Sequence, residues 1–179
     1  MAVSINPTFA RPAEDEYASF YAGYVGRAGE GGLVEQMEAQ VEEVSHLLRG
    51  LHEEAALARY ELGKWSVKEV AGHLADTERV MTYRALRIAR GDQTPLPGFD
   101  ENAFVANADF DARPLASLVG EWEAVRRSTL ALFRGLAPDT HGRTGTASGQ
   151  PVTVRALAYI TAGHVAHHLE ILRTRYGLR

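Results

Sequence analysis

The stretch Gly163-His164-Val165-Ala166-His167-His168-Leu169-Glu170-Ile171-Leu172 contains three of the seven histidines of this chain. The segment otherwise has the pattern of an amphipathic helix. Counted in heptads from Val154, its inward-facing positions are Leu157, Thr161, His164, His168 and Ile171. Two histidines therefore occupy positions where a helix bundle usually has Leu or Ile.

His164 and His168 are four residues apart, so they lie one turn apart on the same helix face, with Cβ atoms roughly 6 Å apart. Two imidazoles at this spacing can bind one metal ion, as in other helical His-x-x-x-His sites. His167 is rotated by about 100° from His168 and is expected to flank this face. A catalytic zinc site typically has three protein ligands and one open position, so a third ligand is needed.

His73 is the best-placed third ligand. It neighbours Leu74 on the buried side of a second helical pattern, whose inward positions are Val67, Val70, Leu74, Thr77 and Met81. Gly72 before it predicts a close approach of another helix. His46 falls opposite the apolar stripe of its own helix, and His141 is expected at the surface.

The alternative interpretation is three core histidines that are hydrogen-bonded to backbone or carboxylate groups. For a single histidine this would be the better explanation. Three on two inward-facing surfaces would each need a separate buried polar partner. The pattern therefore favours one metal site formed by His73, His164 and His168.

Composition limits the function further. With 45% apolar and 23% charged residues, the 179-residue chain is typical of a globular protein with a substantial core. A net charge of −4 argues against a nucleic-acid-binding surface. The absence of cysteine excludes disulfides, thiolate ligands and a cysteine nucleophile, and it fits a cytoplasmic protein. The first residues lack the pattern of a signal peptide, and no apolar run is long enough to predict a membrane span.

The chain is expected to have an extended arm over residues 1–12 and a single domain over 13–179. A short helix is predicted over Glu14–Val25, with aromatic residues on one side for core packing or a subunit contact. Four longer amphipathic helices are predicted over about 33–51, 66–90, 114–136 and 153–176. Ser66 and Glu69 form a capping box at the start of the second of these.

Two long connections separate these helices. Residues 92–113 lack helical periodicity and are expected either to pack across one bundle end beside the metal or to form a surface crossover. Residues 138–151 are expected to be a connector. The prediction is an all-α fold, a four-helix bundle with long crossover connections and a short extra N-terminal helix.

Charged residues in the long helices are expected mainly in solvent. On the third long helix these are Glu121, Glu123, Arg126 and Arg127. Asp76 and Glu78 are either solvated or placed to support the metal ligands. Glu43 and His46 spell one Glu-x-x-His motif, but it lies away from the core and has no second copy, so a di-iron bundle is rejected.

Three runs carry a family resemblance: 64–78 (KWSVKEVAGHLADTE), 94–100 (TPLPGFD) and 163–168 (GHVAHH). They resemble the DinB/YfiT-like superfamily, which is distinct from the DNA-repair polymerase of similar name, and the similarity extends from about Tyr17 to Tyr176. The resemblance implies a four-helix bundle that binds Zn²⁺, Ni²⁺ or another divalent metal through His73, His164 and His168. It also implies frequent homodimers. Members with assigned activity are similar to metal-dependent hydrolases or to thiol S-transferases that use a low-molecular-weight thiol.

Three neutral imidazoles would leave the metal its full positive charge, so a bound water or thiol would lose a proton more easily. The expected function is a metal-dependent hydrolase or thiol S-transferase of the detoxification or stress type, acting on a small molecule. Because the chain has no cysteine, the thiol would be a cosubstrate. No general acid or base is identified.

The alternative is a non-catalytic metal-binding stress protein with a structural metal. A fourth coordination position filled by Asp76, Glu78 or another protein group would favour it. A nucleic-acid accessory role is a weaker third hypothesis, and the net charge argues against it.

Overall fold

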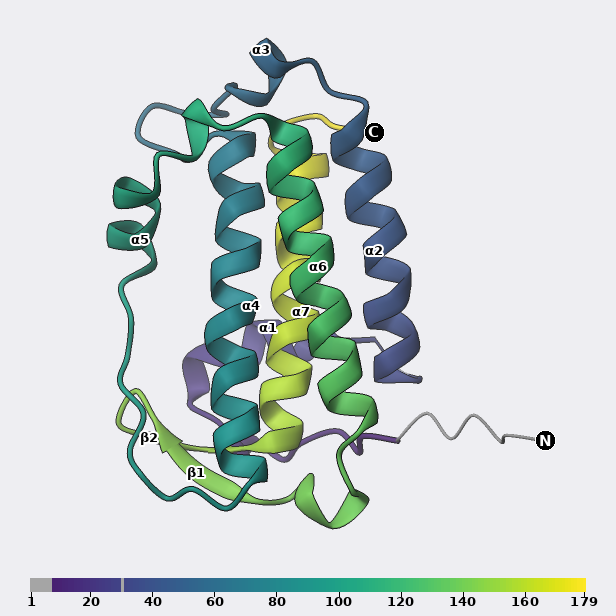
Figure 1. The fold of residues 1–179 in the computed structure, drawn as a ribbon, viewed down its shortest axis with the longest axis vertical. Coiled ribbons are helices and arrows are strands. Elements are labelled where there is room, and N and C mark those ends of the chain that lie inside the picture. The colour runs from purple at the N-terminus through teal and green to yellow at the C-terminus, as the bar shows by residue number, and fades with distance from the viewer. Residues whose placement is uncertain (1–7, 30) are drawn as a thin grey trace, which may run out of the picture.

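A computed structural model describes residues 8–29 and 31–179 of the chain. Its four long helices form the predicted four-helix bundle (Figure 1), and they are α2 (Leu33–Arg49), α4 (Val67–Ala89), α6 (Leu115–Arg134) and α7 (Val154–Thr174). Residues 1–7 of the predicted extended arm lie outside the described residues. Within the described part, no helix has both the length and the apolar character needed to cross a membrane.

The order of the helices explains the long connections. α4 packs against α6 and α7, and α2 packs against the same two helices. Figure 1 shows that α4 and α6 run in the same direction, whereas α2 and α7 run in the opposite one. Since α4 and α6 are parallel neighbours, the chain between them must return along the whole bundle, as the predicted crossover requires.

This return segment contains a helix that the sequence pattern missed. α5 (Glu101–Ala108) stands beside α4 in Figure 1, followed by a 3-10 helix over Phe110–Ala112. The expectation of no helix in 92–113 was wrong because α5 buries only Val105 and so has no apolar stripe. Its start is determined locally, since the Asp100 side chain accepts hydrogen bonds from the backbone N–H groups of Asn102 and Ala103.

The capping box of α4 is confirmed. The Ser66 hydroxyl accepts from the backbone N–H of Glu69 at 3.0 Å, and the Glu69 carboxylate accepts from the backbone N–H of Ser66 at 2.7 Å. At the start of α7, the Thr153 hydroxyl accepts from the backbone N–H of Ala156. These contacts determine where the two helices that carry the three candidate histidines begin.

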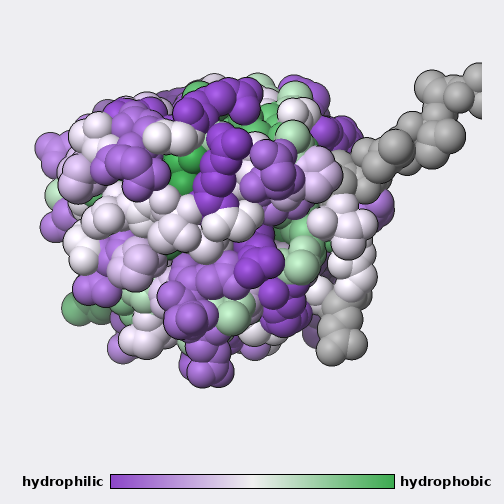
Figure 2. Space-filling model, turned by 90° about the horizontal axis from the view of Figure 1, so that it is seen from below, coloured by the Kyte–Doolittle hydropathy of each residue, from purple (hydrophilic) through white to green (hydrophobic). Residues whose placement is uncertain are grey.

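The expected connector between α6 and α7 contains a short hairpin. Strands β1 (Thr144–Ala147) and β2 (Gln150–Thr153) pair antiparallel through a turn at Ser148 and Gly149, which have φ angles of 53° and 75°. Leu96 pairs with Ala147 and so anchors the segment before α5 to this hairpin. Seen from below in Figure 2, this end of the molecule is mainly hydrophilic, with small hydrophobic areas between the polar residues.

The N-terminal region is less regular than predicted. In place of one helix over Glu14–Val25 there are 3-10 turns at Glu14–Glu16 and Ser19–Tyr21, followed by α1 (Ala22–Arg27) packed on α7. The backbone carbonyl of Tyr24 lies against Gly163, where an added Cβ would be only 1.8 Å from the Tyr24 oxygen. Gly163 is therefore needed for the close approach of α1 to α7.

His141 is buried, which corrects the expectation that it is exposed. The ring of Phe9 stacks on it with centroids 4.0 Å apart, and the Tyr159 hydroxyl donates to the Phe9 carbonyl. A distant segment of chain therefore covers this histidine, and local sequence pattern carries no signal for that contact.

A polar layer divides the core into two apolar clusters. One cluster includes Met37, Met81, Phe133 and Ile160, and the other includes Leu48, Leu74, Trp122 and Leu172. Between them each long helix contributes a buried polar residue, and these are Gln40, Glu78, Arg126 and His164.

Hydrogen bonds in this polar layer connect all four helices. Arg126 donates to both carboxylate oxygens of Glu78 at 2.7 and 2.8 Å and to the Gln40 side-chain oxygen at 2.7 Å. The Gln40 amide in turn donates to the Ala162 carbonyl at 2.8 Å. Glu78, for which solvent and support of the metal ligands were both considered, is instead paired with Arg126. The expectation that Arg126 and Glu123 are solvated was wrong, because both side chains are buried. It failed because α6 packs against both α2 and α4, so its buried face is wider than one heptad stripe.

Candidate metal centre

Three imidazoles meet at the point where α4 packs against α7. The Nε2 atom of His164 lies 2.9 Å from that of His73 and 3.1 Å from that of His168. One ring nitrogen from each residue lies within 4.8 Å of the other two, and all three side chains are buried. The structure thus brings together the three residues that the sequence selected.

Hydrogen bonding alone does not satisfy this arrangement. Each Nε2 atom presents either one hydrogen or one lone pair in the plane of its ring. His164 Nε2 therefore makes a good hydrogen bond to only one of its two neighbours. A cation that accepts a lone pair from all three nitrogens would satisfy the whole group, so the donor set fits a divalent metal ion.

Burial keeps the three rings neutral. It lowers the pKa of His73 to about 4, and it lowers the pKa values of His164 and His168 well below the usual value. The charge that neighbouring imidazoles would carry adds to the effect. Neutral imidazoles have a free lone pair, which is the form that binds a metal.

Thr77 also belongs to this site, although the sequence pattern predicted only that it faces inward. Its hydroxyl lies 3.3 Å from Nδ1 of His73. If Nδ1 carries the hydrogen and donates to this hydroxyl, the lone pair of His73 is on Nε2, facing the other two histidines. Trp65 packs against the His73 ring at 4.6 Å between centroids and limits its rotation.

Gly72 serves a different purpose from the one predicted. A Cβ atom here would lie 2.4 Å from the ring of Phe110, which belongs to the 3-10 helix after α5. The close neighbour is therefore one aromatic ring of the crossover connection and not another long helix.

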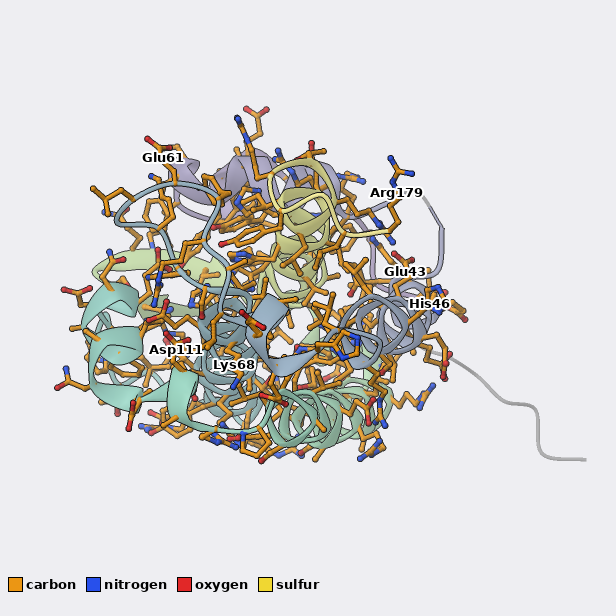
Figure 3. All side chains as sticks on the ribbon, turned by 90° about the horizontal axis from the view of Figure 1, so that it is seen from above. Glu43, His46, Glu61, Lys68, Asp111 and Arg179 are labelled. Carbon is orange, nitrogen blue, oxygen red and sulfur yellow. The ribbon has the colours of Figure 1, made fainter. Side chains whose placement is uncertain are left out.

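The other histidines lie apart from the cluster. His167 is half-buried beside it, with its ring against Tyr24 and His168, as expected for a flanking residue. His46 and Glu43 point outward from α2 (Figure 3), and Glu43 pairs with Arg173. This agrees with the rejection of a di-iron site.

Within the described residues, no carboxylate belongs to the cluster. Asp76 pairs with Arg79, and Glu78 is held by Arg126. Neither of the carboxylates considered as a fourth ligand is therefore available.

Two cavities reach the cluster. The larger, of about 420 Å³, extends to His164 and is lined by Phe20, Tyr21, Tyr24, Thr77, Met81, Phe99 and Glu101, among others. The smaller, of about 240 Å³, extends to His168 and includes Tyr60, Lys64, Trp65, Asn102 and Tyr176. The first turn of α5 contributes to both, through Glu101 and Asn102. Of the two alternatives for residues 92–113, the structure agrees with a position beside the histidine cluster, although the segment runs along α4 and not across one bundle end. The role of the N-terminal aromatic residues as a cavity wall was missed.

Comparison with known proteins agrees with the fold. The chain is 18% identical to YfiT from Bacillus subtilis, described as a probable metal-dependent hydrolase with an unusual four-helix bundle topology; the TM-score is 0.71, and 95% of each chain is covered. Two relatives come from Oceanobacillus iheyensis. "Putative metal-dependent hydrolase OB0413" is 22% identical over 76% of this chain and 79% of its own length. "Putative metal-dependent hydrolase OB0782" is 26% identical over 76% of this chain and 82% of its own length. The family model for the DinB superfamily matches residues 36–172, which is more than half of the chain, and the protein therefore belongs to that superfamily.

Proposed function

We propose that His73, His164 and His168 hold one divalent metal ion and that the protein is a metal-dependent enzyme acting on a small molecule. The observation that carries this proposal is the convergence of three buried, neutral imidazoles, with one cavity reaching His164 and a second reaching His168. The names of the two Oceanobacillus relatives support it.

Zn²⁺ or Ni²⁺ is the proposed metal. Imidazole nitrogen suits both ions, whereas Mg²⁺ and Ca²⁺ prefer oxygen ligands, which the three-histidine cluster does not offer. When bound, such an ion supplies a Lewis acid that makes a water or thiol easier to deprotonate. The protein's own part is to hold the three rings on two packed helices and to maintain the neutral imidazoles by burial.

The reaction is proposed to be hydrolysis or the transfer of a low-molecular-weight thiol, in detoxification or a stress response. Two cavities favour the transfer, because the larger can take an electrophile while the smaller takes the thiol. Hydrolysis would need only one organic ligand. Activity assays on an ester series and on an electrophile with added thiol, each with metal-loaded protein, test the two reactions directly.

The alternative of a purely structural metal has less support. A closed structural site normally has four protein ligands, and the part of the chain that the structure describes supplies three.

A single domain over 13–179, a cytoplasmic location and a homodimer remain parts of the proposal. The exposed Tyr83 and Leu86, which line a shallow groove between α4 and α6, support a subunit contact.

Metal analysis of purified variants tests the site. We expect about one divalent ion per chain in the unmodified protein and in His167→Ala, and a large loss in His73→Ala, His164→Ala and His168→Ala. His167→Ala is the matched control, because it removes an imidazole from the same helix turn. Loss of metal in the control but not in His168→Ala would refute the assignment, and circular dichroism of each variant verifies folding.

A further inference from the structure

The larger cavity combines several aromatic walls with a single ionised side chain. Phe20, Tyr21, Tyr24 and Phe99 supply ring surfaces, and Glu101 is the only Asp, Glu, Lys or Arg among the described residues that line it. We propose that this cavity recognises a substrate carrying an ammonium group, with Glu101 as its counter-ion and the aromatic rings as its walls. This inference rests on the proposed function, since it names the substrate class of the same site.

Aromatic rings and one carboxylate are complementary to an organic cation. The face of an aromatic ring is electronegative and attracts ammonium groups within about 6 Å of its centre. A carboxylate adds a full opposite charge and hydrogen-bond acceptors. A purely apolar substrate would not need the carboxylate, and an anionic one would be repelled by it.

Glu101 has no protein counter-ion in the described residues. Two basic side chains beside the cavity are engaged elsewhere: Arg84 donates to the Pro97 carbonyl at 2.7 Å and to the Ser148 hydroxyl at 3.1 Å, and Arg27 pairs with Glu170. Glu78 in the polar layer, by contrast, is paired with Arg126. The carboxylate of Glu101 is therefore free to accept a cation from a ligand.

The electrostatics of the cavity agree with this role. Glu101 is exposed on one side, but its partial burial against the cavity raises its pKa, and the neighbouring charge of Asp100 adds to the rise. Burial also raises the pKa of Tyr24, and the charge of Glu101 adds to that rise, so the carboxylate acts on the same aromatic wall that contacts His164. A bound ammonium group would relieve this uncompensated negative charge.

The cavity extends from Glu101 on α5 to His164 on α7. A ligand held by its ammonium group at Glu101 would therefore extend its other end toward the histidine cluster. That orientation places the positive group away from the proposed metal ion and the reacting group beside it. Cation recognition and metal chemistry are thus compatible within one cavity.

The test compares 2-phenylethylamine with 2-phenylethanol, which share a phenyl ring and chain but differ in charge. Binding of each is measured by ligand-observed NMR titration on protein that has been incubated with Zn²⁺ and freed of unbound ion, and the metal content of the same samples is determined. The variants are Glu101→Gln, which removes the charge, and Phe99→Leu, which removes an aromatic face. Glu42→Gln is the matched control, because Glu42 is exposed on α2 and loses the same charge far from the cavity.

We expect the amine to bind about tenfold more tightly than the alcohol, and this preference to disappear in Glu101→Gln, as one partly desolvated charge pair with a cation–π contribution implies. Glu42→Gln should keep the preference, and Phe99→Leu should reduce it. Equal binding of amine and alcohol, or an unchanged preference in Glu101→Gln, would overturn the inference. If the protein binds the metal but shows no preference for the amine, only the inference of ammonium recognition is refuted. An amine preference in protein that binds no metal would instead refute the proposed function.

Discussion

Replacing Gly163 by Ala is expected to destabilise the protein although it adds a better helix former. On helix propensity alone, Ala in place of Gly stabilises a helix interior by about 1 kcal/mol. At this position the added Cβ would lie 1.8 Å from the carbonyl oxygen of Tyr24 and 2.5 Å from its carbonyl carbon. Both atoms belong to the backbone, so no side-chain rotation relieves the clash.

Relief requires α1 to move away from α7, and α1 is held in place. The Arg11 guanidinium donates to the carbonyls of Val25 and Ala28 at 2.9 and 2.6 Å. Overpacking a core costs about 1–3 kcal/mol, and an immovable backbone neighbour places this site at the upper end. After the propensity gain is subtracted, we expect a net loss of about 2 kcal/mol, or a Tm lower by about 4–8 °C for a chain of this size.

Gly120→Ala is the matched control. Gly120 lies inside α6, and nothing is within 4 Å of a Cβ added there. The same chemical change should therefore raise stability by about 0.5–1 kcal/mol. Urea and thermal unfolding followed by circular dichroism measure both variants. A Gly163→Ala protein as stable as Gly120→Ala would show that α1 does not pack on α7 as described.

Three further outcomes are expected. Arg126→Met should lower the free energy of unfolding by about 3–5 kcal/mol, because it leaves Glu78 charged and unpaired in the core, and adding Glu78→Leu should recover most of the loss in urea unfolding. The hydrogen bond from Arg155 is the main cause that lowers the pKa of Glu16 from 4.5 to about 2, so this carboxylate contributes stability above pH 4.5 that is lost as the pH falls toward 2. That contribution is at most about 3 kcal/mol, and Glu16→Gln should flatten this part of the pH–stability curve; an unchanged curve would contradict the assignment. Removing the metal with a chelator should lower Tm by several degrees, since a ligand at 100 times its Kd adds about 2.7 kcal/mol, and an unchanged Tm after complete removal would show that the histidines are not coupled to folding.

The long helices and the histidine cluster were predictable because both depend on local periodicity. Heptad spacing identified the inward faces, and the separation of four residues between His164 and His168 placed two imidazoles on one face. His73 followed from its position beside Leu74. These inferences needed no knowledge of which helix lies next to which.

Most of the missed features depend on contacts between distant segments, whereas α5 was missed for a local reason. Arg126 looks like an ordinary surface charge until α6 is placed between α2 and α4, where it meets Glu78 and Gln40. His141 is buried only because Phe9 stacks on it. α5 depends on one capping aspartate and has no apolar repeat, so period-based reasoning does not detect it.

The polar layer has a consequence for how the four helices select a single alignment. Apolar side chains tolerate sliding of one helix past another, since Leu and Ile fit many similar hollows. The bonds from Arg126 to Glu78 and Gln40, and from Gln40 to Ala162, can all be made at only one axial offset of the four helices. A shift of one turn, about 5.4 Å, would leave a buried guanidinium without its acceptors. Ala162 is two residues before His164, so the offset that satisfies Arg126 also brings α7 level with α4 where His73 meets His164 and His168. The same axial alignment of the helices therefore satisfies the polar layer and brings the three histidines together.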